Sequence, residues 1–226
     1  MSLSTQNLLA IDTSTSHALV SLAVGEQFFH RQQMAQIGHA QHLLTMIDEV
    51  LQEAGCTIAE LHGIVFGRGP GSFTGLRIAC SVAKALAYPQ NLPLYPVSTL
   101  AAIAVEAQKN HPRLPVLALI DARMQQCYWA TFQASVPQKN SPPAIEEQLS
   151  DPAAIYLPPP GPYLLAGVGF ESYITQFPLE TQQQIQATEH TLPSTYAMIT
   201  LTRQGKVSSV SAQEALPTYI RNNVTT

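Results

Sequence analysis

The sequence predicts an α/β protein made of two related lobes. Short apolar runs alternate with segments of helical periodicity over the N-terminal half. An apolar strand ending in Ile-Asp, a turn and a second strand occur near residue 8 and again near residue 116. Asp12 and Asp121 are 109 residues apart (121 − 12), which suggests a duplicated unit, with chance similarity of so short a repeat as the alternative. We therefore expect an N-terminal lobe at 1–112 and a smaller C-terminal lobe at 113–226.

Three strands and a helix open the first lobe. Apolar residues predict strands at 8–12, 18–24 and 27–31. The helix predicted at 39–54 carries one apolar stripe, and Gly55 follows it as a typical residue after a helix C-terminus. This order predicts a strand meander followed by a covering helix.

A strand, a glycine-rich turn and a second helix come next. The strand is predicted at 63–66, and small residues recur at helical spacing after the turn. Pro93 and Pro96 interrupt the pattern that follows. Ser98 is then expected to cap a helix that runs to about Lys109.

The second lobe is read from fewer signals. Strands are predicted at 116–121, 127–132 and 163–168. The proline-rich segment 137–162 is expected to be a loop or an extended cover. Ser194 is expected to cap the last main helix.

Composition limits the classes of protein that the chain can be. Hydrophobic residues make up 46% and charged residues 12%, which suits a folded protein with a core and excludes a disordered one. The net charge of −4 argues against strong independent binding of RNA, although a local basic patch is compatible with it.

Cysteines and hydropathy indicate where the protein works. Cys56, Cys80 and Cys127 are odd in number and widely spaced, which fits free thiols in a reducing cytosol. The N-terminus has no pattern of a signal peptide, and no apolar run reaches the ~18 residues of a membrane span. We expect a cytoplasmic protein that does not enter a membrane.

Residues 67–77 read Gly-Arg-Gly-Pro-Gly-Ser-Phe-Thr-Gly-Leu-Arg. A glycine-rich turn before a helix exposes backbone N–H groups at the positive end of the helix dipole, which suits an anion. The run is not a Walker loop, because no Gly-Lys-Ser/Thr closes it. Glycine content alone predicts a tight structural turn equally well.

As a whole, the run is similar to the signature of the TsaB (YeaZ) family, bacterial proteins needed to make threonylcarbamoyl-adenosine in tRNA. Five other segments resemble the same family: Ile11–Thr15, His39–Leu51, Val97–Leu100, Ile120–Arg123 and Pro217–Arg221. The resemblance is dense to about residue 132 and weak from there to the tail. It implies an actin-like ATPase (ribonuclease H-like) fold, with two lobes of mixed sheet flanked by helices.

By the same resemblance, the chain is a non-catalytic scaffold of a threonylcarbamoyl-transferring complex. It would pair with the catalytic paralogue TsaD and with the P-loop ATPase TsaE, and it would meet tRNA only through that complex. A homodimer of the free protein is also open. No tightly bound cofactor is implied, with ATP or ADP placed at the interface of the complex.

The resemblance also assigns residues. A nucleotide or interface loop would contain Gly69, Gly71, Ser72, Thr74, Gly75 and Arg77. Partner-facing helices would present Leu43, Ile47, Val50, Leu51, Leu76, Ala79, Cys80 and Ala83. Packing of these helices on the chain's own sheet is the alternative, and it is favoured for most of the second helix.

Two other functions compete with the scaffold: a stand-alone nucleotide-dependent hydrolase or kinase-like enzyme of the actin-like superfamily, and a homodimeric binding module. Active members of that superfamily hold a phosphate with an Asp-x-Gly-Thr hairpin. Here the first copy, Asp12 to Thr15, has Ser14 in the place of the glycine. The second copy, which begins at Asp121, lacks the glycine as well.

Protease and metal patterns are weaker still. Ser72 directly follows Gly71, so the run is not the Gly-x-Ser-x-Gly elbow of a serine hydrolase. His39 and His42 could present two ligands on one helix face, but no third ligand is evident. We therefore expect neither a catalytic residue nor a metal site.

Overall fold

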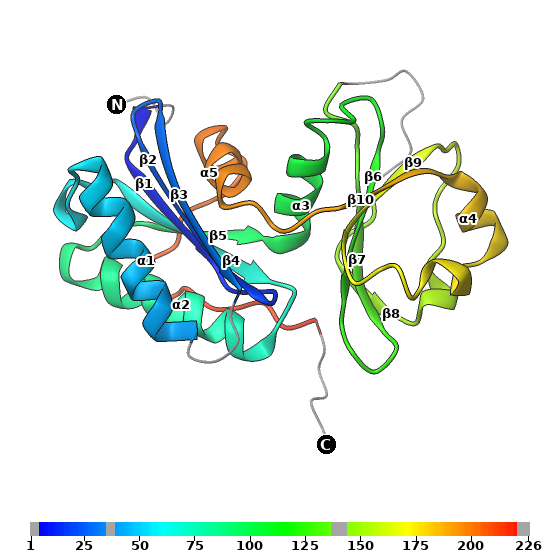
Figure 1. Ribbon diagram of the computed structural model, residues 1–226, viewed down its shortest axis with the longest axis horizontal. Coiled ribbons are helices and arrows are strands. Elements are labelled where there is room, and N and C mark those ends of the chain that lie inside the picture. Colours follow the sequence, from blue (N-terminus) through cyan, green and yellow to red (C-terminus); the bar gives the residue numbers. More distant parts are fainter. Residues whose placement is uncertain (1–4, 35–38, 137–143, 221–226) are drawn as a thin grey trace. The chain divides into compact units, whose positions relative to one another are not determined.

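Two five-stranded mixed sheets with flanking helices make up the described part of the chain (Figure 1). The structure is a computed structural model that describes residues 5–34, 39–136 and 144–220, with residues 39–41 described by their backbone. This arrangement confirms the predicted fold class of two related lobes with mixed sheets. None of the described helices is long and apolar enough to cross a membrane.

The first sheet has the strand order β3-β2-β1-β4-β5. Its strands are β1 (Leu8–Asp12), β2 (His17–Val24), β3 (Gln27–Met34), β4 (Gly63–Gly69) and β5 (Leu94–Ser98). The first three pair antiparallel as a meander, and β4 and β5 continue from β1 in parallel. All five residues of β1 are buried, as expected for a central strand covered on both faces.

Helices cover both faces of this sheet. Helices α1 (His39–Ala54) and α2 (Phe73–Ala87) lie on one face, and α5 (Thr195–Arg203) lies on the other (Figure 1). The predicted stripe of α1 packs with alternate residues of β1, including Leu9 and Ile11. Gly55 has a positive φ of 60° and follows the last residue of α1, which confirms the predicted helix end.

The second sheet has the order β10-β9-β6-β7-β8. Its strands are β6 (Val116–Asp121), β7 (Cys127–Phe132), β8 (Gln148–Ser150), β9 (Tyr163–Val168) and β10 (Ile185–His190). The first three again pair antiparallel, and β9 and β10 again extend the sheet in parallel from its first strand. The two sheets therefore share one topology, which supports the duplication inferred from the repeat.

Two of the described helices belong to the second unit. Helix α3 (Thr99–Ala107) packs its apolar residues against β6, β7 and β9, and α4 (Leu179–Gln184) precedes β10. Short 3-10 turns occur at Ile58–Glu60, Tyr88–Gln90, Pro152–Ala154 and Ile174–Gln176.

The chain divides into compact units at other residues than we expected. The first unit consists of residues 1–99 and 194–218, and the second consists of 100–193 and 219–226. The expected boundary at 112/113 differs because each half contributes its last helix to the other unit. Helix α3 follows β5 but packs with the second sheet, and α5 follows β10 but packs with the first.

Several elements were missed from sequence. Strand β5 contains Pro96, which the edge position of this strand allows, and it pairs with the later residue Val210 through Leu94. Strand β8 lies within 137–162, so that part of the expected loop is wrong, while residues 137–143 lie outside the described residues.

Candidate functional site

The turn between β1 and β2 occupies the place of a phosphate hairpin, and it is closed by its own side chains. The amide and the hydroxyl of Ser14 both donate to Oδ1 of Asp12, at 3.0 and 2.7 Å. This is the Asx-turn arrangement, in which an aspartate side chain replaces a backbone acceptor. Ser14, which stands in the glycine position, therefore engages Oδ1 of Asp12 with both its amide and its hydroxyl.

The glycine-rich turn before α2 lies directly against this hairpin. The Ser72 amide donates to the Ser14 carbonyl at 2.7 Å, and Thr13 Oγ1 donates to the Gly75 carbonyl at 2.6 Å. A Cβ atom on Gly71 would overlap the Ser14 carbonyl, and one on Gly75 would overlap the Thr13 carbonyl. The glycines at these two positions are thus required by the contact between two backbones.

Ser72 caps α2. Its Oγ accepts from the Gly75 amide at 3.3 Å, and its carbonyl accepts from the Leu76 amide at 2.9 Å. The amides of Ser72 and Gly75 are at the end of α2 where an anion would bind, and both already donate to protein acceptors. This is the tight structural turn that glycine content also predicted, and a nucleotide role of the loop stays a prediction.

Asp12 is fully buried at the end of β1. Its Oδ2 has no hydrogen-bond partner among the described residues, and it lies so close to Gly67 that a Cβ there would overlap it. Burial raises the pKa of Asp12 to about 6, against the opposing effect of the two hydrogen bonds from Ser14. A carboxyl group enclosed in this way is not presented to a phosphate or a cation in solvent.

Asp121 occupies the corresponding position at the end of β6. Its Oδ1 accepts from the Arg123 amide at 2.8 Å and from the Tyr173 hydroxyl at 2.9 Å. The guanidinium of Arg123 lies 3.6 Å from the other oxygen. Burial, together with the bond to Asp121, raises the pKa of Tyr173 to about 12, so this hydroxyl remains a donor.

The structure gives the weaker patterns little geometry for chemistry. The hydroxyl of Ser72 is engaged in capping, and in the part of the chain that is described it forms no hydrogen bond with a histidine. Among the described residues, no three His, Cys, Asp or Glu side chains are grouped so that they could hold a metal ion. The side chain of His39 lies outside the described residues.

The residues expected to face a partner are not on the exposed faces of α1 and α2. All eight are buried in the core of the first unit: Leu43, Ile47, Val50, Leu51, Leu76, Ala79, Cys80 and Ala83. Their apolar stripes cover the chain's own sheet, so an interface on α1 and α2 must use the opposite faces. The burial of all eight agrees with the alternative stated for these helices, packing on the chain's own sheet, because apolar periodicity does not separate a core face from a partner face.

The opposite faces carry apolar groups of their own. Leu44 on α1 is 48% exposed and Phe73 on α2 is 41% exposed. The guanidinium of Arg77 stacks over the Phe73 ring at 3.9 Å. A shallow groove of about 340 Å³ runs along α2, lined by Phe73, Thr74, Arg77, Ile78, Ser81 and Val82. Thr74 and Arg77 thus belong to a solvent-facing surface, whereas Gly69 ends β4, Gly71 lies in the turn and Gly75 lies buried in the first turn of α2.

Comparisons with known proteins give consistent matches along nearly the whole chain. The family model of TsaD, tRNA N6-adenosine threonylcarbamoyltransferase, matches residues 26–211. The tRNA threonylcarbamoyladenosine biosynthesis protein TsaB of Haemophilus influenzae is 34% identical, over 96% of this chain and 94% of its own length. TsaB of Escherichia coli is 29% identical, over 96% and 95%.

Solved structures agree with these matches. A crystal structure from Pseudomonas aeruginosa, described as an uncharacterized protein with similarity to peptidase YeaZ, superposes with a TM-score of 0.85 at 33% identity. That match covers 96% of this chain and 100% of the other. A second structure, YeaZ from Pseudomonas aeruginosa, gives a TM-score of 0.82 at 33% identity, covering 95% and 99%.

Proposed function

This chain belongs to the TsaB (YeaZ) family of tRNA threonylcarbamoyladenosine biosynthesis proteins, and from that premise we propose that it is a non-catalytic subunit of the complex that transfers the threonylcarbamoyl group to tRNA. The observation that carries the proposal is similarity to named TsaB proteins over nearly the full length of both chains. Its partners would be a TsaD-like paralogue, which performs the transfer, and a TsaE-like P-loop ATPase.

The closed hairpin supports the non-catalytic part of the proposal. An actin-like enzyme needs an open turn whose backbone reaches a phosphate, and here Ser14 and Asp12 close that turn on each other. Ser72 Oγ accepts from the Gly75 amide as a helix cap, and among the described residues it forms no hydrogen bond with a histidine that could activate it for a peptidase. Neither arrangement favours the stand-alone hydrolase or kinase-like alternative.

The outer faces of α1 and α2 are the surface that we assign to the paralogue. The two helices pack against each other on one face of the sheet, and each presents an exposed apolar residue, Leu44 or Phe73. Exposed apolar groups on neighbouring helices are typical of a protein-protein interface. A second copy of the chain is the competing occupant of the same surface.

Charge supports an indirect role toward tRNA. With a net charge of −4, the chain lacks the overall basic balance of a protein that holds RNA by itself. We therefore place tRNA and any ATP or ADP at the assembled complex, and we place the complex in the cytoplasm.

Reconstitution tests the function. The chain is mixed with the TsaD-like, TsaE-like and adenylate-forming proteins of its own organism, and incorporation of labelled threonine into tRNA is followed. We expect incorporation to require this chain, and the isolated chain to hydrolyse no ATP. Full activity of the mixture without the chain would overturn the scaffold role.

Surface variants test the interface through their affinity for the TsaD-like protein. Leu44→Glu and Phe73→Glu place a charge on the proposed face and should weaken binding to the TsaD-like protein about tenfold or more, as truncation of an interface anchor does. Leu179→Glu is the matched control, because Leu179 is an exposed leucine on α4, a helix of the second unit. Equal affinity of all three variants would show that the paralogue binds elsewhere.

A further inference from the structure

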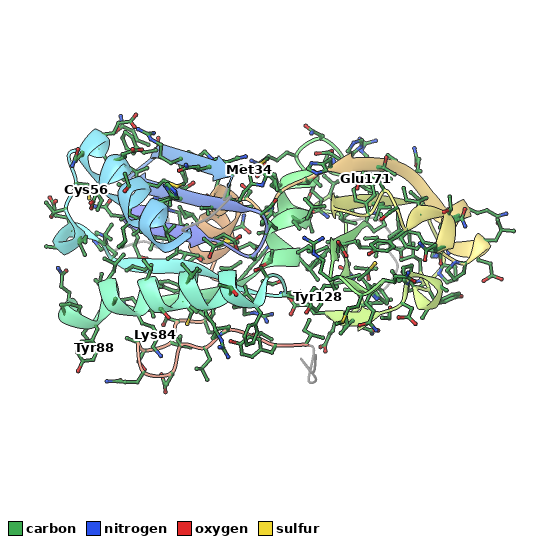
Figure 2. The ribbon with its side chains drawn as sticks, turned by 60° about the horizontal axis from the view of Figure 1, so that its bottom comes forward. Met34, Cys56, Lys84, Tyr88, Tyr128 and Glu171 are labelled. Atoms are coloured by element: carbon green, nitrogen blue, oxygen red, sulfur yellow. The ribbon has the colours of Figure 1, made fainter. Side chains whose placement is uncertain are left out.

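The tail after α5 forms a strap, defined here as residues 208–218, that crosses the first unit. Val210 exchanges two backbone hydrogen bonds with Leu94 of β5, at 2.8 and 3.0 Å. The Ala215 carbonyl accepts from Lys84 Nζ of α2 at 3.1 Å. Figure 2 shows Lys84 on the side of α2 along which this segment runs. The strap is thus bonded to β5 and to α2.

The strap ends on the glycine-rich turn. The Thr218 amide donates to the carbonyl of Arg68 at 2.7 Å. The Thr218 carbonyl lies against Gly69, where a Cβ would come within 3.0 Å of it, and Gly69 has a positive φ of 108°. The end of β4, which leads into the turn, is therefore bonded to the C-terminal end of the first unit.

The second half of the turn is bonded to the N-terminal hairpin. Ser14 accepts from the Ser72 amide, and Thr13 donates to the Gly75 carbonyl. Segments near both ends of the sequence thus meet on a single turn, one before Pro70 and one after it. The junction from the end of β4 to the first turn of α2, residues 69–75, contains three glycines, and glycine has more backbone freedom than other residues where it is not held.

We propose that the strap and the β1–β2 hairpin form a clamp that fixes the glycine-rich turn and thereby the start of α2, with Thr13, Ser14 and Thr218 as its positioning residues. Helix N-termini fray because their first amides lack intrahelical partners. The clamp supplies acceptors or donors to Arg68, Ser72 and Gly75, which span the approach to the helix and its first turn. The consequence for partner binding rests on the proposed function, since α2 carries part of the proposed interface.

Hydrogen exchange of the free, full-length protein tests the clamp without any partner. Thr13→Val removes the hydroxyl that holds Gly75, and Thr218→Pro removes the amide that holds Arg68. Each variant should speed exchange of peptides that cover residues 67–76 about five- to tenfold, the effect of losing one net hydrogen bond. Lys84→Met, which releases Ala215, is the milder second variant should Thr218→Pro fail to fold.

Thr202→Val is the matched control. Thr202 is buried and donates to the Met198 carbonyl at 3.0 Å, so it loses the same kind of hydroxyl bond, but within α5. Faster exchange at 67–76 in both the hairpin and the strap variants, and not in the control, supports the clamp. Wild-type exchange in either folded variant overturns it.

Affinity for the TsaD-like protein separates the clamp from the proposed function. Faster exchange with weaker affinity supports both. Faster exchange with wild-type affinity supports the clamp and contradicts α2 as the partner-binding helix. Unchanged exchange overturns the clamp whatever the affinity.

Discussion

Asp12→Asn should remove a pH dependence of stability that a single buried carboxyl imposes on the first unit. The side chain is fully enclosed, and among the described residues only the amide and hydroxyl of Ser14 bond to it, both on Oδ1. Its Oδ2 faces Gly67 with no hydrogen-bond partner among the described residues. Ionisation therefore places a charge in a site that is closed to water and offers one oxygen nothing to bind.

The size of the effect follows from the rise in pKa from 3.8 to about 6, which burial causes. At 1.36 kcal/mol for each unit of pKa, the rise corresponds to about 3 kcal/mol. Because the folded pKa is raised, the folded state binds the proton more tightly than the unfolded state does. The stabilisation is thus full below about pH 4, is lost as the pH rises through about 6, and stays lost above about 7.

Asparagine cannot ionise, so the difference in stability between wild type and Asp12→Asn should change by about 2.5 kcal/mol between about pH 4 and pH 7.5. For a chain of this length, that change moves the gap in Tm by roughly 5–10 °C. The stability of Asp12→Asn relative to that of wild type should be highest at the higher pH, where the wild-type carboxyl is charged.

Thermal melts at a series of pH values measure this gap. Far-UV circular dichroism follows both units, whereas the single tryptophan, Trp129 on β7, reports the second unit and serves as an internal reference. Asp48→Asn is the control, because Asp48 is exposed on α1 and its loss removes a charge without opening a buried site. A gap between wild type and Asp12→Asn that stays constant over this pH range would refute the reasoning.

Three further predictions concern other buried contacts. Gly75→Ala should lower the free energy of unfolding, measured by denaturant titration, by several kcal/mol, because its Cβ would overlap the backbone of Thr13. Gly161→Ala is the control: its Cβ would contact the flexible Gln184 side chain, and it should lower the free energy of unfolding by about 1 kcal/mol or less. Arg203→Met should lower the free energy of unfolding by about 1–3 kcal/mol, because the Arg203 guanidinium donates to the carbonyls of Gln6 and Gly25 at 2.7 Å each. A decrease below about 0.5 kcal/mol would contradict this prediction. The three cysteines are buried, and burial raises the pKa of Cys127 to about 12, so in the native protein all three should react with a thiol reagent far more slowly than in the unfolded protein. Rapid labelling of the native protein would count against the packing.

Local signals predicted local structure well. The apolar stripe of α1, the glycine after it and the capping hydroxyl of Ser194, which accepts from the Ala197 amide, all act within one or two helical turns. The strand repeat also predicted that both sheets begin alike. Strand β10 was missed because its residues alternate between partly buried and exposed, without the apolar run that marks an inner strand.

Contacts between distant segments explain what the sequence did not reveal. Thr13 contacts Gly75, and Thr218 contacts Arg68, only after the chain has folded. The spacing of the glycines therefore could not show which residues of the run bind a ligand and which pack against another backbone. The eight interface candidates were misplaced for a related reason. A helical stripe shows which residues are apolar, but not whether its own sheet or a partner covers them.

The two aspartates indicate what the repeated hairpin does in this protein. In each lobe, Oδ1 accepts from the amide two residues later, that of Ser14 at 3.0 Å and that of Arg123 at 2.8 Å. In each, a glycine from the adjacent parallel strand or its end lies against the carboxyl-bearing side chain: Gly67 beside Asp12, and Gly169 beside Asp121. The surroundings otherwise differ, because one carboxyl is fully buried and the other meets a tyrosine and an arginine. The arrangement common to both lobes is thus an Asx turn packed on a glycine, which gives each aspartate a structural reason to occupy its strand end.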